Sequence, residues 1–319
     1  MSICAELQTM LRAARLYYED GLTQQQVADE LGVSRPKVSR LLTRARAEGI
    51  VRITIVDPFA TFGEVEQHLV ETFGLREAVV IAGEGLSEEA LRRRLGLAAA
   101  SYLRRTLRDG LRVGVGWGRT LRATVEALNN ERQVAIHAVP LIGGIGQVSP
   151  SFQVNDLARR MAEAFGGTWQ ALYAPAFVGD TQARDALLNH PDVKLVMEGW
   201  ETLDVALVGI GHFAFQRQSS MFFAEYMAQT LLQELEERGA MGDLCGRFFD
   251  IYGRQCILEA GVIGISLDQL KALDHVIGVA GGKEKMTAIL GALRGGYLNV
   301  LITDTVTAQA VLEHHENET

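Results

Sequence analysis

Cysteine is scarce in this chain of 319 residues. The three cysteines, Cys4, Cys245 and Cys256, have no CxxC spacing and cannot all pair with one another. A disulfide framework needs an even set of cysteines and a zinc site needs closely spaced ones, so neither is expected. We therefore expect buried or incidental thiols and no metal site.

Long hydrophobic runs are also absent. The longest apolar stretches, such as residues 203–210, are far shorter than the roughly 20 residues that span a membrane. The first ten residues contain Glu6 and no basic residue, which does not fit a secretory signal. We expect a soluble cytoplasmic protein with no membrane partner. With 48% hydrophobic residues, the chain is long enough and apolar enough for two domains.

The chain has no overall excess of positive charge, because its net charge is −8. This argues against a nucleic-acid partner only if the charge is evenly spread. Residues 1–55, however, carry eight basic and six acidic side chains, and residues 33–47 contain five basic side chains and no acidic one. Screening limits repulsion beyond about 10 Å, so this stretch can face phosphates even on an acidic protein.

The first fifty residues have the pattern of three short helices. Residues 7–18 repeat apolar side chains every three to four positions, and Thr23 is placed to cap a second helix over residues 24–31. Gly32 supplies a tight turn, and Ser34 caps a third, basic helix. Two short helices joined by a glycine turn form a helix-turn-helix, which places a helix end in the major groove of DNA.

The third helix is expected to read operator DNA. Arginine and lysine side chains on its first turns favour guanine, whereas side chains at its far end or on the preceding helix more readily hold phosphates. The candidates for base edges are Arg35, Lys37, Ser39 and Arg40. The other predicted DNA contacts are Thr23, Gln24, Ser34 and Arg44, with Arg46 near the phosphates. The alternative is an ordinary helical hairpin with a solvated basic face.

A domain boundary is predicted near residue 56. Residues 50–55 alternate apolar and polar side chains, which predicts a strand that forms either a small wing or a connection between domains. Asp57 and Pro58 then break the pattern. The sequence therefore predicts an all-α DNA-binding domain over residues 1–56 and an effector and oligomerisation domain over residues 57–319.

The larger domain alternates helical and strand patterns. Predicted helices cover residues 62–73, 87–108, 120–128, 155–165, 181–189, 224–238 and 286–293. Predicted strands cover residues 78–81, 112–115, 135–140, 169–172, 205–208, 275–279 and 299–302. Continuous apolar strands separated by amphipathic helices predict an α/β domain with a mostly parallel sheet covered on both faces.

Glycine-rich loops follow three of these strands, at the carboxyl edge where small ligands bind in such sheets. In the first, over residues 113–120, glycines and a helix start can present N–H groups to an anion, with Arg119 and Thr120 as further donors. Its spacing fits neither GxGxxG nor the GK[ST] loop, so no nucleotide cofactor is predicted. Taken alone, such a turn is at least as often a packing feature.

The other two loops strengthen the case for a ligand site. The second, over residues 279–285, places Lys285 at the start of a helix, where it could face an anion. The third, over residues 139–146, is a further glycine cluster and is followed by Gln153. Three such loops after three strands are harder to explain by packing than one.

Seven short motifs follow one another along the larger domain: Gly114-Val-Gly-Trp-Gly-Arg-Thr120, Pro140-Leu-Ile-Gly-Gly144, Gly209-Ile-Gly211, Gly239-Ala-Met-Gly-Asp243, Val279-Ala-Gly-Gly282, Leu293-Arg-Gly-Gly296 and Leu301-Ile-Thr-Asp304. Their order, together with the helix-turn-helix, resembles the SorC/DeoR type of sugar-binding transcriptional regulators. The resemblance covers nearly the whole chain.

The resemblance implies a sensor domain similar to the fold of glucosamine-phosphate deaminase and ribose-phosphate isomerase, a phosphorylated sugar or polyol as effector, and a tetramer. Carried over by motif, the effector-binding residues are Gly116, Trp117, Gly118, Arg119, Thr120, Gly143, Gly144, Gln153, Asp243 and Lys285. Gly116 to Thr120 and Lys285 would hold the phosphate, and Gln153 and Asp243 would bind hydroxyls. Ser219 or Ser220 is a looser candidate. Some relatives have an arginine where this chain has Ile142, which leaves one charge fewer for a second phosphate.

Two other functions fit parts of the sequence. An isomerase or deaminase could use Asp243 or Asp304 with Lys285 as a base, but the DNA-reading module would then be unexplained. A DNA-binding protein whose second domain only oligomerises is the other alternative. We predict a regulator, not an enzyme, in which the effector favours one arrangement of the subunits and so changes operator binding.

Overall fold

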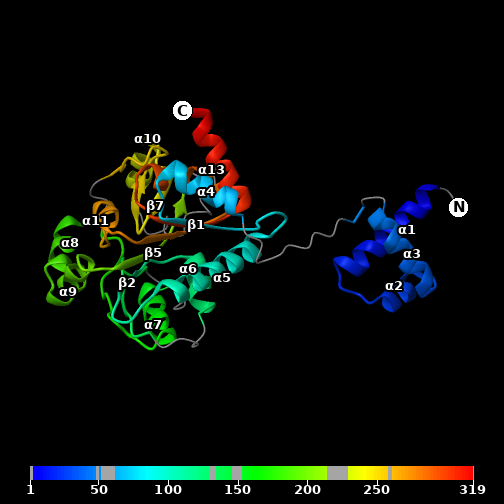
Figure 1. The fold of residues 1–319 in the computed structure, drawn as a ribbon, viewed down its shortest axis with the longest axis horizontal. Coiled ribbons are helices and arrows are strands. Elements are labelled where there is room, and N and C mark those ends of the chain that lie inside the picture. The colour runs from blue at the N-terminus through cyan, green and yellow to red at the C-terminus, as the bar shows by residue number, and fades with distance from the viewer. Residues whose placement is uncertain are drawn as a thin grey trace. The chain divides into compact units, whose positions relative to one another are not determined.

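The computed structural model describes residues 3–47, 50–51, 62–128, 134–145, 153–213, 229–257 and 261–318. The chain divides into two compact units, Met1–Asp57 and Pro58–Thr319 (Figure 1). Within the described residues, none of the helices has both the length and the apolar character needed to cross a membrane.

The first unit consists of three helices, α1 (Ile3–Tyr18), α2 (Gln24–Leu31) and α3 (Arg35–Ala47). Thr23 begins α2 with a capping box, because its hydroxyl accepts from the Gln26 N–H while the Gln26 side chain accepts from the Thr23 N–H. Gly32 ends α2 with a φ of +61°, a left-handed conformation that glycine adopts readily. The helices close on a core of Met10, Ala13, Ala14, Val27, Ala28, Val38, Leu41, Leu42 and Ala45. The predicted helix-turn-helix region is confirmed.

Seven parallel strands form the central sheet of the second unit, in the order β1-β10-β9-β5-β2-β3-β4. They are β1 (Glu77–Ile81), β2 (Arg112–Val115), β3 (His137–Pro140), β4 (Thr168–Trp169), β5 (Val205–Gly209), β9 (Val276–Val279) and β10 (Val300–Asp304). The predicted mostly parallel α/β domain is therefore confirmed.

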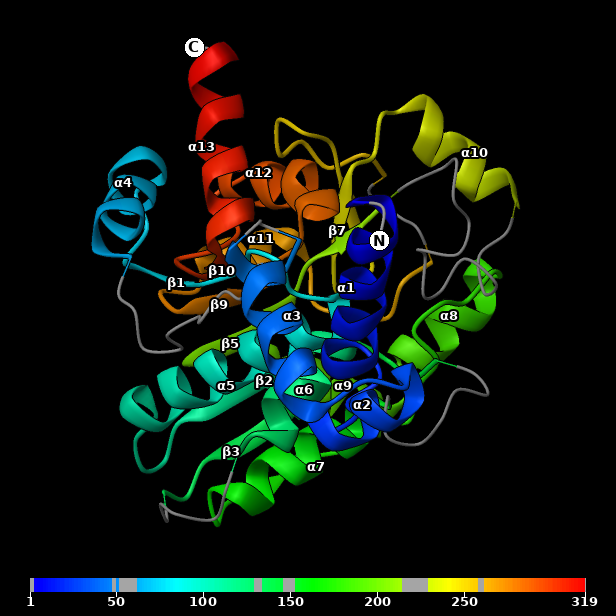
Figure 2. The same cartoon turned by 90° about the vertical axis from the view of Figure 1, so that its right-hand side faces the viewer.

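Helices cover both faces of this sheet (Figures 1 and 2). One face packs against α5 (Glu88–Thr106), α6 (Arg119–Glu126) and α7 (Val154–Ala164). The other packs against α4 (Gly63–Phe73), α11 (Leu267–Ala272), α12 (Met286–Arg294) and α13 (Thr305–Glu318). Alternate strand residues supply the two cores, since Val205 and Leu207 join the first and Ala206 and Val208 the second.

Several short elements were not predicted. Strand β6 (Gly211–His212) follows directly after β5 and forms a small antiparallel sheet with β7 (Gly242–Leu244) and β8 (Arg247–Phe249), which come later in the chain. These strands contain only two or three residues, which is too short for a recognisable alternation. Helix α9 (Pro191–Trp200) and the 3₁₀ helix η4 (Lys283–Lys285) were not predicted either, whereas α8 (Thr181–Leu188) and α10 (Gln229–Glu237) fall within the predicted helices 181–189 and 224–238.

The strand predicted over residues 169–172 is wrong beyond Trp169. Leu172 pairs instead with the side chain of Asn155, whose Nδ2 donates to the Leu172 carbonyl at 3.1 Å and whose Oδ1 accepts from the Leu172 N–H at 2.9 Å. A side-chain amide thus takes the place of a strand partner, which an apolar pattern cannot indicate. Residues 52–55 of the predicted wing, residues 224–228 of a predicted helix, and Ser219 and Ser220 lie outside the described residues.

Candidate functional site

The exposed side of α3 carries most of the side chains expected to meet DNA. Arg35, Ser39, Arg40 and Arg44 are exposed, and Lys37 is half-buried. Ahead of the helix, Thr23 and Ser34 are exposed and Gln24 is half-buried. No acidic residue lies on α3, so its outward surface presents cations and hydroxyls to any ligand. This is the composition that phosphate and base-edge contacts require.

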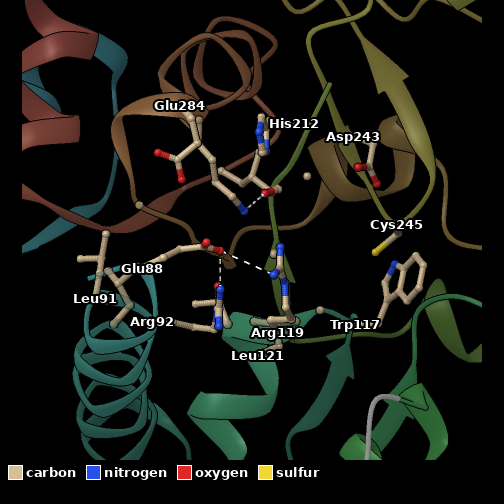
Figure 3. Close-up of a pocket in the computed structure, with 18 residues that line it drawn as sticks. Glu88, Leu91, Arg92, Trp117, Arg119, Leu121, His212, Asp243, Cys245 and Glu284 are labelled. Atoms are coloured by element: carbon tan, nitrogen blue, oxygen red, sulfur yellow. Dashed lines mark hydrogen bonds and ion pairs between the residues drawn. The ribbon is translucent and has the colours of Figure 1, made fainter. Parts of the chain in front are cut away.

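The second unit has a cavity of about 110 Å³ at the carboxyl edge of its sheet. The cavity lies where β2 and β5 are neighbours in the sheet. After β2 the next strand of this sheet, β3, is added on one side of the pair, and after β5 the next strand of this sheet, β9, is added on the other side. Loops that diverge in this way leave a crevice between them. The loops after β2, β5 and β9 line the cavity together with the first turns of α5 (Figure 3).

The loop after β2 brings the start of α6 to the cavity. The Gly116 N–H donates to the Leu207 carbonyl at 2.8 Å, which extends the pairing of β2 with β5 into the loop. Gly118 then turns the chain into α6 with a φ of +128°, and it has no side chain with which to cap the helix. Because the first N–H groups of a helix have no acceptor within it, those of Arg119 and Thr120 are available to an anion.

Lys285 reaches the same cavity from the loop after β9. Its Nζ donates to the carbonyl of Ile210, after β5, at 2.7 Å. The residue is half-buried, and desolvation of its ammonium group lowers the pKa to about 8, although the Asp243 carboxylate opposes this shift. A bound anion would replace the lost solvation and favour the charged form of Lys285.

Asp243 is the buried carboxylate of the site. Strand β7 pairs with β6 so that Asp243 lies opposite Gly211, and a Cβ atom at Gly211 would overlap the carboxylate. The Gly246 N–H donates to Asp243 Oδ2 at 3.0 Å. Burial raises the pKa of Asp243 to about 6, while that hydrogen bond and Lys285 act in the opposite direction. Asp243 is therefore mostly charged at pH 7 and becomes neutral as the pH falls below about 6.

Cys245 and His212 lie in the wall of the cavity, whereas Cys256 does not line it. Cys245 and Cys256 are buried, and burial raises the pKa of Cys256 to about 11. Burial also lowers the pKa of His212 in the cavity wall, which keeps the imidazole neutral at pH 7. Among the described residues, no group of three His, Cys, Asp or Glu side chains could hold a metal ion.

Sequence reasoning missed the contribution of α5. Glu88 Oε1 lies 2.5 Å from Arg92 Nη2 and 3.6 Å from Arg119 Nη1, so one carboxylate bridges two guanidinium groups beside the cavity (Figure 3). The sequence around Glu88 and Arg92 has the alternating charges of a solvated helix face. Only the topology, in which α5 packs beside α6, could have indicated its role.

Gly116, Gly143, Gly144 and Gln153 were expected at the same site, but they do not line the cavity. A Cβ atom at Gly143 would lie 2.5 Å from the Ala174 carbonyl oxygen, and the Gly144 N–H donates to that oxygen at 2.8 Å. Gln153 Nε2 donates to the Ile145 carbonyl at 2.6 Å. Gly143 and Gly144 hold the loop after β3 against the segment around Ala174, and Gln153 ties the same loop to the start of α7, so the glycines there serve close backbone packing.

Asp304, the other aspartate that could act as a catalytic base, is hydrogen-bonded to neighbouring protein groups. Its Oδ2 accepts from the Gly282 N–H at 2.9 Å and from the Thr307 hydroxyl at 2.6 Å. The side chain is buried and does not line the cavity. It fixes the loop that carries Lys285. Trp117, Gly118, Arg119, Thr120, Asp243 and Lys285 are the predicted effector residues that do meet at the cavity.

Comparison with known proteins matches both units to families. A sugar-binding domain model (Sugar-bind) matches residues 57–313, and a homeodomain-like model matches residues 6–53. The sorbitol operon regulator of Klebsiella pneumoniae is 36% identical over 97% of this chain and 98% of its own length. The deoxyribonucleoside regulator of Bacillus subtilis is 32% identical over 96% of this chain and 97% of its own. The crystal structure of the full-length K. pneumoniae sorbitol operon regulator SorC superposes with a TM-score of 0.75 at 35% identity, covering 96% of this chain and 98% of that one.

Proposed function

We propose that this chain, which belongs to the SorC/DeoR-type family of sugar-binding transcriptional regulators, changes its operator binding when a phosphorylated sugar or polyol occupies the cavity at the edge of its parallel sheet. The relatives named above are transcriptional regulators, and this chain is a regulator, not an enzyme. The proposal that the effector is phosphorylated is based on the side chains and helix start that line the cavity.

One observation supports a phosphate most directly. The uncapped start of α6, the Arg119 side chain and the Lys285 ammonium group converge on one cavity from two separate loops. Helix N–H groups and fixed cations together favour a compact anion with several acceptor oxygens. Asp243, buried in the same cavity, can accept from sugar hydroxyls in its charged form and donate in its neutral form.

The DNA-binding half of the proposal rests on α3. Its exposed cations would enter the major groove of operator DNA, and Thr23, Gln24 and Arg44 would hold the phosphates on either side. We propose that the protein acts in the cytoplasm as a homotetramer. An effector that binds one arrangement of the subunits about a hundredfold better supplies about 2.7 kcal/mol per site toward that arrangement.

A thermal-shift screen tests the effector. Each sugar phosphate is paired with its unphosphorylated parent, and the expected result is stabilisation by one or a few phosphorylated members only. A ligand at about a hundred times its Kd stabilises by roughly 2.7 kcal/mol, which such a screen detects easily. The hit must also change the affinity of the protein for DNA selected from a random pool. Equal stabilisation by a parent sugar would remove the phosphate from the proposal.

A further inference from the structure

The carboxylate of Glu88 already holds two of the three cations at the cavity. It makes a hydrogen-bonded ion pair with Arg92 four residues along α5 and a longer one with Arg119 at the start of α6. The Glu88 side chain is 65% exposed, whereas that of Arg92 is 21% exposed. The carboxylate can therefore turn toward solvent while the guanidinium group of Arg92 stays beside the cavity (Figure 3).

The charges that line the cavity are balanced without a ligand. Three side chains are basic and three are acidic: Arg92, Arg119, Lys285, Glu88, Asp243 and Glu284. A phosphate dianion that enters adds negative charge, so its binding is favoured if an acidic group moves away. Asp243 is buried and hydrogen-bonded to Gly246. Glu284 is exposed and interacts electrostatically with Lys285, but among the described residues it makes no direct ion pair with a cation. Glu88 is the carboxylate that can leave and free cations as it does so.

We propose that Arg92 and Arg119 form an anion subsite at the cavity, which Glu88 occupies in the free protein and from which the effector's phosphate displaces it. This inference rests on the proposed function, since it assumes that a phosphate enters this cavity. Because exposed ion pairs are weak, displacement of Glu88 costs little, and Glu88 lowers the affinity of every anion that must displace it by the same factor. Glu88 thereby weakens anion binding at this subsite without affecting ligand contacts elsewhere in the cavity.

The test compares Glu88→Gln with wild type by calorimetric titration of inorganic phosphate at constant ionic strength. Glutamine keeps the shape of the side chain and removes the charge that competes. The expected result is phosphate binding about fivefold tighter in Glu88→Gln, the factor that corresponds to roughly 1 kcal/mol. Glu89→Gln is the matched control, because Glu89 pairs with Arg93 at the same spacing on α5 but does not line the cavity. Its affinity should stay within about twofold of wild type.

Each outcome decides one of the two claims. Unchanged or weaker phosphate binding by Glu88→Gln overturns the subsite, because Glu88 would then be a bystander or would hold the arginines in place for the ligand. An equal gain in Glu89→Gln also overturns it, since the effect would come from net charge alone. Titration of Lys285→Met tests the proposed function separately: if phosphate binds this variant as well as wild type, the phosphate lies elsewhere and the proposed function fails.

Discussion

The two units expose their functional side chains in opposite ways. In the first, one helix carries the candidate DNA contacts on its outer face while its inner face closes a small core. In the second, the candidate ligand contacts lie on the loops after β2, β5 and β9 and on α5, and they meet only because the strand order brings them together. A short stretch of sequence thus contains the candidate DNA-binding surface of the first unit (the reader), whereas the ligand cavity of the second unit (the sensor) depends on the whole sheet. Each unit should therefore fail independently of the other.

The largest effect is expected where the sheet supports the sensor. Gly143→Ala should destabilise the second unit by about 3 kcal/mol, because the added Cβ meets backbone atoms of Ala174 and Pro175 that cannot move aside as a side chain can. Hydrogen exchange followed by mass spectrometry should show lost protection in the second unit and none in the first. Gly179→Ala, where a Cβ meets nothing within 4 Å, is the control. Equal losses of protection in both units would mean that they do not fold independently.

Lys285→Met should weaken binding of the phosphorylated effector about a hundredfold, because a charge-assisted contact of this kind contributes roughly 2.7 kcal/mol. Methionine keeps most of the length of the side chain and removes the ammonium group. Binding to DNA in the absence of effector should be unchanged, as measured by fluorescence anisotropy. Lys283→Met, an exposed neighbour in the same loop, should behave as wild type. A matching loss in both variants would assign the effect to the loop's overall charge.

Asp243→Asn should change how stability depends on pH. Burial raises the pKa of Asp243 to about 6 from 3.8. The contribution of Asp243 to the stability of the folded state is therefore largest below about pH 4, where the side chain is neutral, and it is lost as the pH rises to 6 and the buried side chain becomes charged. Above pH 6 the buried carboxylate is a cost, which asparagine removes. The variant should be about 2 kcal/mol more stable than wild type at pH 8, with the difference vanishing near pH 4. Thermal unfolding across this range measures it, and a less stable variant at pH 8 would show that the carboxylate stabilises the cavity through Lys285.

The smallest effect is expected in the reader. Arg40→Ala should weaken binding to DNA selected by the wild-type protein about tenfold and binding to random DNA about twofold, because a contact to a base edge carries sequence preference. The effector's affinity should not change. Arg12→Ala serves as control, since Arg12 lies on α1 and pairs with Glu30 at 3.8 Å. Equal losses on both kinds of DNA would limit Arg40 to phosphate contacts.

The sequence predicted those parts of the fold that depend on local patterns. The apolar runs at β2, β5 and β9 are long enough to identify strands, and the glycine loop before Arg119 and the loop ending at Lys285 were identified from their positions after these strands. The glycines at 143 and 144 have the same local pattern as Gly118, yet they pack against backbone instead of facing the cavity. Local sequence does not contain this difference, because it depends on which distant segment approaches the loop.

The contribution of α5 could not be predicted for a related reason. Glu88 and Arg92 are charged residues near the start of an amphipathic helix, where solvent exposure is the usual outcome. The chain reaches α5 from β1, at the edge of the sheet, and goes on from it to β2 near the middle. This long connection places α5 beside α6. The periodicity of a helix in the sequence does not indicate which other helix it will pack against.

Gly211 constrains how the specificity of this sensor can change over evolutionary time. Every missense mutation of its codon introduces at least a Cβ, and the space that this atom needs is taken by the Asp243 carboxylate. A substitution at Gly211 therefore requires the Asp243 side chain to move or to change first, which makes the glycine slow to diverge. New ligand preferences should therefore arise more readily through exposed charges such as Glu88 and Arg119 than through Gly211.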